Sequence, residues 1–146
     1  MRDYTKIDAW KLADDLTVEV YQMTRSFPKE ELYSLTNQLR RAAYSVPANM
    51  AEGASREGKR DYLHFLYIAR GSLSETQYFI HLSNRLGYVS AAESERLRGE
   101  TKRAFACLHG LIRAVEKEAG VLPKVIATIT SLIVLCLARG IVRPVV

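Results

Sequence analysis

The chain contains four long stretches in which apolar residues recur at alternating spacings of three and four. This spacing places the apolar side chains on one face of an α-helix, so each stretch predicts an amphipathic helix. The first predicted helix spans residues 8–26, with Asp8 as its N-cap and Pro28 preventing its continuation. Its apolar face consists of Ala9, Ala13, Leu16, Val20, Met23 and Phe27.

Three further helices are predicted from the same pattern, over residues 29–53, 58–86 and 90–118. We expect Ser90 to act as the N-cap of the helix over residues 90–118, and Gly53 to cap the C-terminus of the helix over residues 29–53. The apolar face is Leu32, Leu35, Leu39, Ala42, Val46 and Met50 in the second predicted helix. It is Tyr62, Phe65, Leu66, Ala69, Leu73, Thr76 and Ile80 in the third, and Leu97, Thr101, Ala104, Leu108, Leu111 and Val115 in the fourth.

The predicted helices are similar in length, about 30 to 43 Å at a rise of about 1.5 Å per residue. Helices of similar length joined by short connections favour antiparallel neighbours, and no stretch alternates with the period of a β-strand. The sequence therefore predicts an all-α protein, an antiparallel up-down four-helix bundle over residues 1–120 with an extra apolar tail over residues 121–146.

The third predicted helix carries a second apolar seam, formed by Ile68, Phe79, Leu82 and Leu86. Two neighbouring seams give an apolar arc wider than one inward-facing side of a helix requires. We therefore expect copies of the chain to associate and cover this surface.

Two residues interrupt the helical pattern. Pro47 has no backbone N–H and crowds the carbonyl of Ala43, so we expect a bend there and another donor for that carbonyl. The bend either shapes a functional surface or simply lets the helix wrap around the core. Gly71 costs about 1 kcal/mol of helix stability relative to alanine. It suggests the close approach of another backbone, within the bundle or from a neighbouring subunit.

The tail differs in composition from the rest of the chain. Between Val125 and Ala138 it is almost uncharged and rich in valine, isoleucine and threonine, over 14 residues. A helix needs about 20 residues to span a bilayer, so a membrane anchor is disfavoured. The tail is expected either to cover apolar surface in an oligomer or to form a poorly ordered appendage.

Composition limits the possible partners and location. The net charge is +5, of which the tail supplies +3 and the bundle only +2. This is a weak preference for polyanions. The charged first residues do not resemble a secretory signal, and Cys107 and Cys136 have no metal-ligand spacing. We therefore expect a cytoplasmic protein with free thiols, Cys107 packing as a small apolar residue.

The sequence lacks the motifs of common enzymes. It has neither a phosphate-binding glycine loop nor a Gly-x-Ser-x-Gly turn. A metal site in a bundle needs paired Glu-x-x-His motifs, but the chain offers only Asp61 and His64. His64, His81 and His109 share no ligand spacing on one helix face. We expect no catalysis, cofactor, metal or small-molecule substrate.

A polar stripe borders the apolar face of the second predicted helix. Its side chains are either the solvated edge of that helix or a hydrogen-bonded network at a subunit interface. In a network, a partly buried Arg41 would require Glu52 or Glu75 as its carboxylate partner. The candidate residues are Gln38, Arg41, Ser45, Asn49, Glu52 and Glu75.

Basic residues form two groups along the sequence. The first, with Tyr44 and Tyr62 nearby, is the candidate nucleic-acid site: Arg40, Arg41, Arg56, Lys59 and Arg60. Basic side chains neutralise phosphates, and aromatic rings stack on unpaired bases. The second group is Arg96, Arg98, Lys102 and Arg103. Acidic residues are interleaved with both groups, which equally favours solvated, ion-paired helix faces.

Two runs of sequence resemble a known family: FPKEELYSLTNQLRRAA at residues 27–43 and SVPANMAEG at residues 45–53, supported by Trp10 and by ARGSLSE at residues 69–75. The family is the bacterial four-helix-bundle proteins encoded within intervening sequences of 23S ribosomal RNA genes. Its relatives include the accessory variability protein of diversity-generating retroelements. The resemblance implies a ring-like homo-pentamer and, for the retroelement branch, binding of nucleic acid and a reverse transcriptase. The weakly basic bundle and the apolar tail depart from the family pattern.

Two functions follow as hypotheses. The first is a non-enzymatic homo-oligomer, a pentamer by the resemblance, that acts as a scaffold or interaction protein. The alternative is weak, sequence-tolerant binding of RNA or DNA through basic patches repeated around the oligomer.

Overall fold

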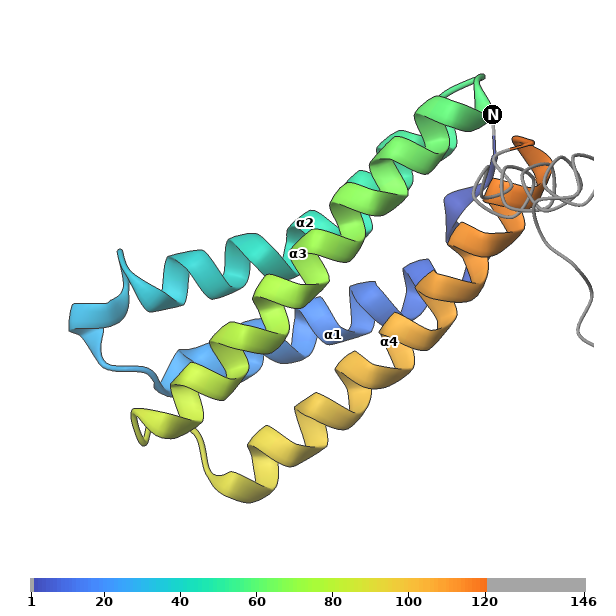
Figure 1. Ribbon diagram of the computed structural model, residues 1–146. Helices are drawn as coiled ribbons and strands as arrows, with labels where there is room; N and C mark the ends of the chain where they lie inside the picture. Colours follow the sequence, from blue (N-terminus) through green and yellow to red (C-terminus); the bar gives the residue numbers. More distant parts are fainter. Residues whose placement is uncertain (1, 121–146) are drawn as a thin grey trace, which may run out of the picture.

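The computed structural model describes residues 2–120, which fold into four long helices and three short 3-10 turns. The long helices are α1 (Asp8–Met23), α2 (Leu35–Ser55), α3 (Lys59–Arg85) and α4 (Ala91–Glu118). Successive helices run in opposite directions, and the N-terminus lies near the end of α4 (Figure 1). α1 packs on α2 and α4, and α3 packs on the same two helices. The predicted all-α four-helix bundle is confirmed, whereas the predicted tail over residues 121–146 lies outside the described residues.

Most of the predicted apolar faces form one core. Every predicted core residue of the first helix is buried, and the seam of α3 is buried apart from the half-buried Phe65. In α4, Ile112 is buried more deeply than the predicted Leu111. The buried hydroxyls of Thr76 and Thr101 donate to the carbonyls of Ser72 and Leu97 one turn earlier. These bonds allow hydroxyl groups inside the core.

The helix ends agree only partly with the sequence patterns. The Ser90 hydroxyl accepts a hydrogen bond of 3.2 Å from the N–H of Glu93, as expected of an N-cap. Gly87, which follows α3, has a φ of +77°, a conformation that favours glycine. The predicted cap at Asp8 is wrong, because Ile7 occupies that position and Asp8 is the first residue of the helix. The carboxylate of Asp8 still lies near the positive end of the helix dipole.

The start of α2 is later than predicted. Residues 29–31 form a 3-10 turn and the α-helix begins at Leu35, so Leu32 lies outside it and its side chain is 47% exposed. The prediction of Leu32 as a core residue is therefore wrong. The Glu31 carboxylate accepts hydrogen bonds from the Ser34 hydroxyl, the Leu35 N–H and the Tyr88 hydroxyl. These bonds, led by the one from Ser34, lower the pKa of Glu31 and tie the start of α2 to the α3–α4 connection.

Pro47 lies inside α2, which continues to Ser55 and changes direction near its middle (Figure 1). Because Pro47 has no N–H, the Ala43 carbonyl loses its helical donor. The hydroxyl of Thr17 on α1, shared with the Ala13 carbonyl, lies 3.0 Å from the Ala43 carbonyl. The indole N–H of Trp10 donates to the carbonyl of Pro47 at 3.1 Å. α1 thus supplies donors on both sides of the bend.

Gly53 is not the C-cap of α2 but a buried residue inside the helix. A methyl group on it would lie 2.8 Å from Cβ of Phe65 and 2.9 Å from Cδ2 of Tyr62, so only glycine lets α3 approach this closely. Gly71 has the opposite environment: a methyl group there would meet no atom within 4 Å. The expected close approach at Gly71 within the bundle is therefore wrong, and an approach by a neighbouring subunit stays a prediction.

The second apolar seam of α3 is only partly free. Phe79 and Leu82 pack against the chain's own core. Ile68 and Leu86 are 39% and 49% exposed. The surface left for a partner is thus smaller than the sequence pattern predicts.

Substitution of Gly53 by alanine tests the close packing of α2 on α3. We expect Gly53→Ala to destabilise the fold by about 1 to 3 kcal/mol, because the new methyl group overpacks the contact with Phe65. Gly110→Ala is the control: it adds a methyl group in open space and should stabilise α4 by about 0.5 to 1 kcal/mol. Urea unfolding of both variants at one protein concentration measures the difference. Equal effects of the two substitutions would contradict the packing argument.

Thr17→Val tests the replacement donor at the bend. We expect a loss of about 1 to 3 kcal/mol, because the carbonyl of Ala43 is left without a donor. In a Pro47→Ala background the helix regains its own N–H, so the same substitution should cost about 1 kcal/mol less. A double-mutant cycle by urea unfolding measures this coupling. A cost that is identical in both backgrounds would show that Thr17 does not compensate for Pro47.

Candidate functional site

The outer face of α2 and α3 holds a hollow of about 380 Å³, which we call the α2–α3 hollow. It is lined by Gln38, Arg41, Ala42, Ser45, Ser72, Glu75 and Phe79. Three of the five residues of the predicted polar stripe, Gln38, Arg41 and Ser45, thus lie here with Glu75 of α3, beside one residue of the second apolar seam of α3. The spacing that aligned the polar residues along α2 is what brings them to one side of this hollow.

A short hydrogen-bonded chain joins the two helices at this face. The hydroxyls of Ser45 and Ser72 are 3.0 Å apart. The side-chain amide of Asn49 donates to the carbonyl and to the hydroxyl of Ser45, at 2.7 and 3.0 Å. The contact between the two serines fixes the register of α2 against α3. Whether the stripe also forms a subunit interface stays a prediction.

The charged members of the stripe do not pair as expected. Glu52 binds Arg56, four residues later and just beyond the end of α2. Arg41 and Glu75 are both exposed, and neither forms an ion pair with any residue in the range 2–120. The predicted pairing of Arg41 with Glu52 or Glu75 is therefore wrong within one chain. Within the described part of the chain, the hollow thus has one cation and one anion on its rim without an ion-pair partner.

A second hollow, the α1–α2 hollow, lies between the end of α1 and the start of α2 and measures about 300 Å³. It is lined by Tyr21, Leu32, Tyr33, Thr36, Asn37, Arg40 and Tyr44. The side chain of Tyr33 is 85% exposed. The guanidinium of Arg40 lies 4.9 Å from the centre of the Tyr21 ring, and its Nε donates to the Thr24 hydroxyl at 2.7 Å. This surface combines aromatic rings with one fixed cation.

Sequence reasoning missed the α1–α2 hollow, although it noted Tyr44. The signal was the position of Val18 and Tyr21, which lie three residues apart and outside the apolar face of α1. Both are exposed in the structure. Large apolar residues on the wrong side of an amphipathic helix are a recognisable mark of an interaction surface.

The five basic residues of the candidate nucleic-acid site do not form one patch. Arg40 lines the α1–α2 hollow and Arg41 lines the α2–α3 hollow. Sixteen residues separate Arg40 from Arg56, which is about 24 Å along a helix. At that far end, Arg56 binds Glu52 and Lys59 binds Glu118 at 3.2 Å, while Arg60 is exposed.

The second basic group also has acidic partners. Arg96 binds Glu19 at 2.7 Å and Arg98 binds Glu95 at 3.3 Å. Arg103 binds Glu100. The bond from Arg103 is the main reason that the pKa of Glu100 is lowered. Ion-paired helix faces, the plainer interpretation of the sequence, describe these contacts well.

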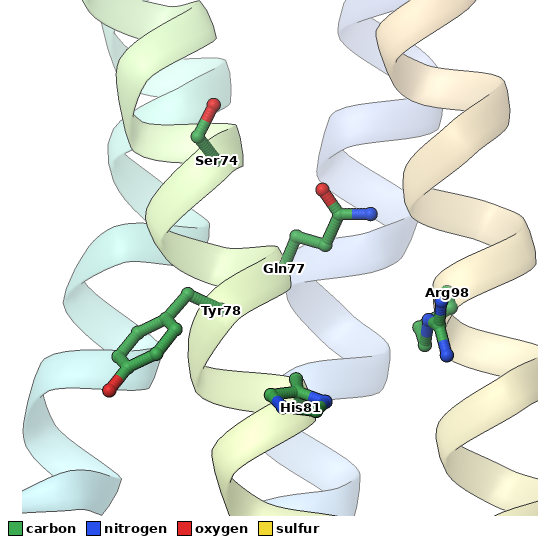
Figure 2. Close-up of a pocket in the computed structure, with 5 residues that line it drawn as sticks. All are labelled: Ser74, Gln77, Tyr78, His81 and Arg98. Carbon is green, nitrogen blue, oxygen red and sulfur yellow. The ribbon is translucent and has the colours of Figure 1, made fainter.

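A third hollow of about 280 Å³, the α3–α4 hollow, is lined by Ser74, Gln77, Tyr78, His81 and Arg98 (Figure 2). His81 is exposed, as are His64 and His109. In the part of the chain that the structure describes, no three His, Cys, Asp or Glu side chains gather as they would around a metal ion. Cys107 is a free thiol that packs against the core, whereas Cys136 lies outside the described range.

Comparisons with protein families and with solved structures identify relatives of this chain. The family model of the 23S rRNA-intervening sequence proteins matches residues 5–110. The chain belongs to this family. A solved structure, a protein of unknown function from the S23 ribosomal protein family of Bacteroides thetaiotaomicron, has the same fold with a TM-score of 0.67. At 20% identity, the match covers 72% of this chain and 95% of that one. No curated protein matches the chain.

The match extends over all four helices, although it stops eight residues before the end of α4. It includes all the residues that line the three hollows. Among residues 2–120, no helix is long and apolar enough to cross a membrane.

Proposed function

We propose that this member of the 23S rRNA-intervening sequence protein family is a non-enzymatic homo-oligomer, a ring-like pentamer that acts as a scaffold or interaction protein. The observation that carries the proposal is the exposure of large apolar side chains on two different faces of one chain. On the α1–α2 face these are Val18, Tyr21, Leu32, Tyr33 and Tyr44. On α3 they include Ile68 and Leu86, the outer ends of its second seam.

The presence of exposed apolar patches on two different faces favours one kind of assembly over another. A two-fold dimer uses the same patch on both subunits, whereas a ring joins one patch of each subunit to a different patch of the next. A chain with a single exposed patch would suit a dimer. A chain with two separate patches suits a closed ring, in which every subunit covers one patch of each neighbour.

The α2–α3 hollow supports association in a second way. Interfaces combine an apolar centre with polar groups that select the partner and its orientation. The rim charges Arg41 and Glu75 have no ion-pair partner within the described residues and line the same hollow as Phe79 of the second seam of α3. Opposite charges on a neighbouring subunit would complete them without the cost of breaking existing ion pairs.

Tyr33→Ser tests the proposal. We expect the wild-type chain to run as five subunits in size-exclusion chromatography with light scattering, and the variant to associate at least about tenfold more weakly, as expected for loss of an aromatic interface residue. The helical content should not change, because Tyr33 lies outside the core. His109→Ser, which removes an exposed ring on α4 away from both patches, is the control. A wild-type chain that is monomeric at micromolar concentration would refute the proposal.

The α1–α2 hollow favours a second candidate function, weak binding of single-stranded nucleic acid. Arg40 and three tyrosines line one hollow, and exposed rings beside a cation stack well on unpaired bases. We expect Arg40→Gln to weaken oligonucleotide binding about tenfold in filter assays at low salt, and Arg113→Gln, on α4, to have little effect. Affinity that stays constant as salt rises to about 100 mM would exclude phosphate contacts.

A further inference from the structure

The side chains that line the α3–α4 hollow share one chemical property. Its five side chains are a serine, a glutamine, a tyrosine, a histidine and an arginine. Every one of them can donate a hydrogen bond, and none carries a carboxylate. By contrast, the α2–α3 hollow contains Glu75, and the α1–α2 hollow combines three tyrosines with Leu32, which has no donor in its side chain. Among the three, the α3–α4 hollow is the one in which every lining side chain can donate a hydrogen bond, a lining that suits a small anion.

The part of the hollow nearer α4 is formed by Gln77, His81 and Arg98 (Figure 2). Gln77 and His81 are one turn apart on α3 and extend toward the side on which α4 carries Arg98 (Figure 2). Ser74 and Tyr78 lie on the part of the hollow farther from α4. Gln77 and Arg98 are half-buried, so packing already restricts their side chains before a ligand binds. Restricting donors in advance lowers the entropy cost of binding.

The surroundings of the hollow are also basic. Arg85 follows His81 by four residues on α3, and Lys102 follows Arg98 by four residues on α4, so each lies on the same helix face as its neighbour in the hollow. Neither Arg85 nor Lys102 forms an ion pair with a residue that the structure describes. Glu95, which does not line the hollow, forms an ion pair with Arg98 at 3.3 Å, and its own side chain is largely exposed.

We propose that the α3–α4 hollow binds a phosphate dianion, either inorganic phosphate or the terminal phosphate of a monoester. Arg98 supplies the charge-assisted contact, Gln77 and His81 donate from α3, and Arg85 and Lys102 contribute at longer range. Glu95 competes with the ligand for Arg98. The site goes beyond the proposed self-association, because it lies on α3–α4 and uses neither of the two patches assigned to subunit contacts.

Because Glu95 competes for Arg98, one substitution should weaken phosphate binding and another should strengthen it. Isothermal titration calorimetry of the full chain with inorganic phosphate, at constant ionic strength set by chloride, measures the affinity. We expect Arg98→Gln to weaken phosphate binding by about tenfold or more. We expect Glu95→Gln to strengthen binding several-fold, because it removes the carboxylate that occupies Arg98.

Two control variants separate a local site from the general charge of the protein. Arg113→Gln removes an exposed cation elsewhere on α4, and Glu118→Gln removes an exposed acid that binds Lys59. They change the net charge by the same amounts as the test variants and should leave the phosphate affinity unchanged. If each control acts like its test variant, the attraction is a general charge effect and the proposal is wrong.

Titration with phosphoserine and with a short single-stranded oligonucleotide separates the sources of phosphate. Binding of phosphoserine with an affinity similar to that of inorganic phosphate, lost in Arg98→Gln, supports a monoester site. An oligonucleotide that binds more tightly than phosphate and competes for Arg98 would overturn the proposal in favour of a phosphodiester surface. Heat signals no larger than those of chloride alone would also overturn it. Light scattering on each variant shows whether assembly is intact, so a failure of self-association is distinguished from a failure of this site.

Discussion

The hydrogen bonds between α1 and the bend of α2 are the constraint on which the other features depend. Pro47 removes one helical hydrogen bond, and a carbonyl left without a donor inside a protein is costly. Thr17 supplies a donor to the Ala43 carbonyl, and Trp10 contacts the Pro47 carbonyl from the same helix. These hydrogen bonds hold α1 on one side of α2 and fix its position along the axis of α2. The other side of α2 remains available for α3, which approaches closely at Gly53.

Periodicity predicted the four helices and most of the core because each apolar face is a property of a single helix. It could not predict features that depend on a second helix. Gly53 reads as a helix cap in sequence, but its role comes from Tyr62 and Phe65 on α3. Leu32 fits the apolar spacing of α2, yet the 3-10 turn after Pro28 leaves it outside the helix. The need for a donor at Ala43 was predictable, whereas its source in Thr17 was not.

The candidate sites, too, were predictable where they depend on one helix and unpredictable where they depend on a second. Spacing along α2 correctly aligned Gln38, Arg41 and Ser45, since residues three and four apart share a face. The charge partners were not predictable, because Glu52 binds Arg56, at the C-cap of α2, instead of Arg41. The basic residues from Arg40 to Arg60 look like one cluster in sequence. A helix separates them, because a segment of this length places its two ends at opposite ends of the bundle.

The three hollows differ in chemistry because different helix pairs form them. The α1–α2 hollow collects tyrosines that face away from the core, and the α2–α3 hollow combines the charges of Arg41 and Glu75 with part of an apolar seam. Every side chain that lines the α3–α4 hollow can donate a hydrogen bond, and none carries a carboxylate. Apolar surface favours association with another protein surface, whereas an open cluster of donors retains its hydration until an anion replaces the water. A ring built through the first two surfaces would therefore leave the third facing solvent in every subunit, where it would be repeated around the assembly.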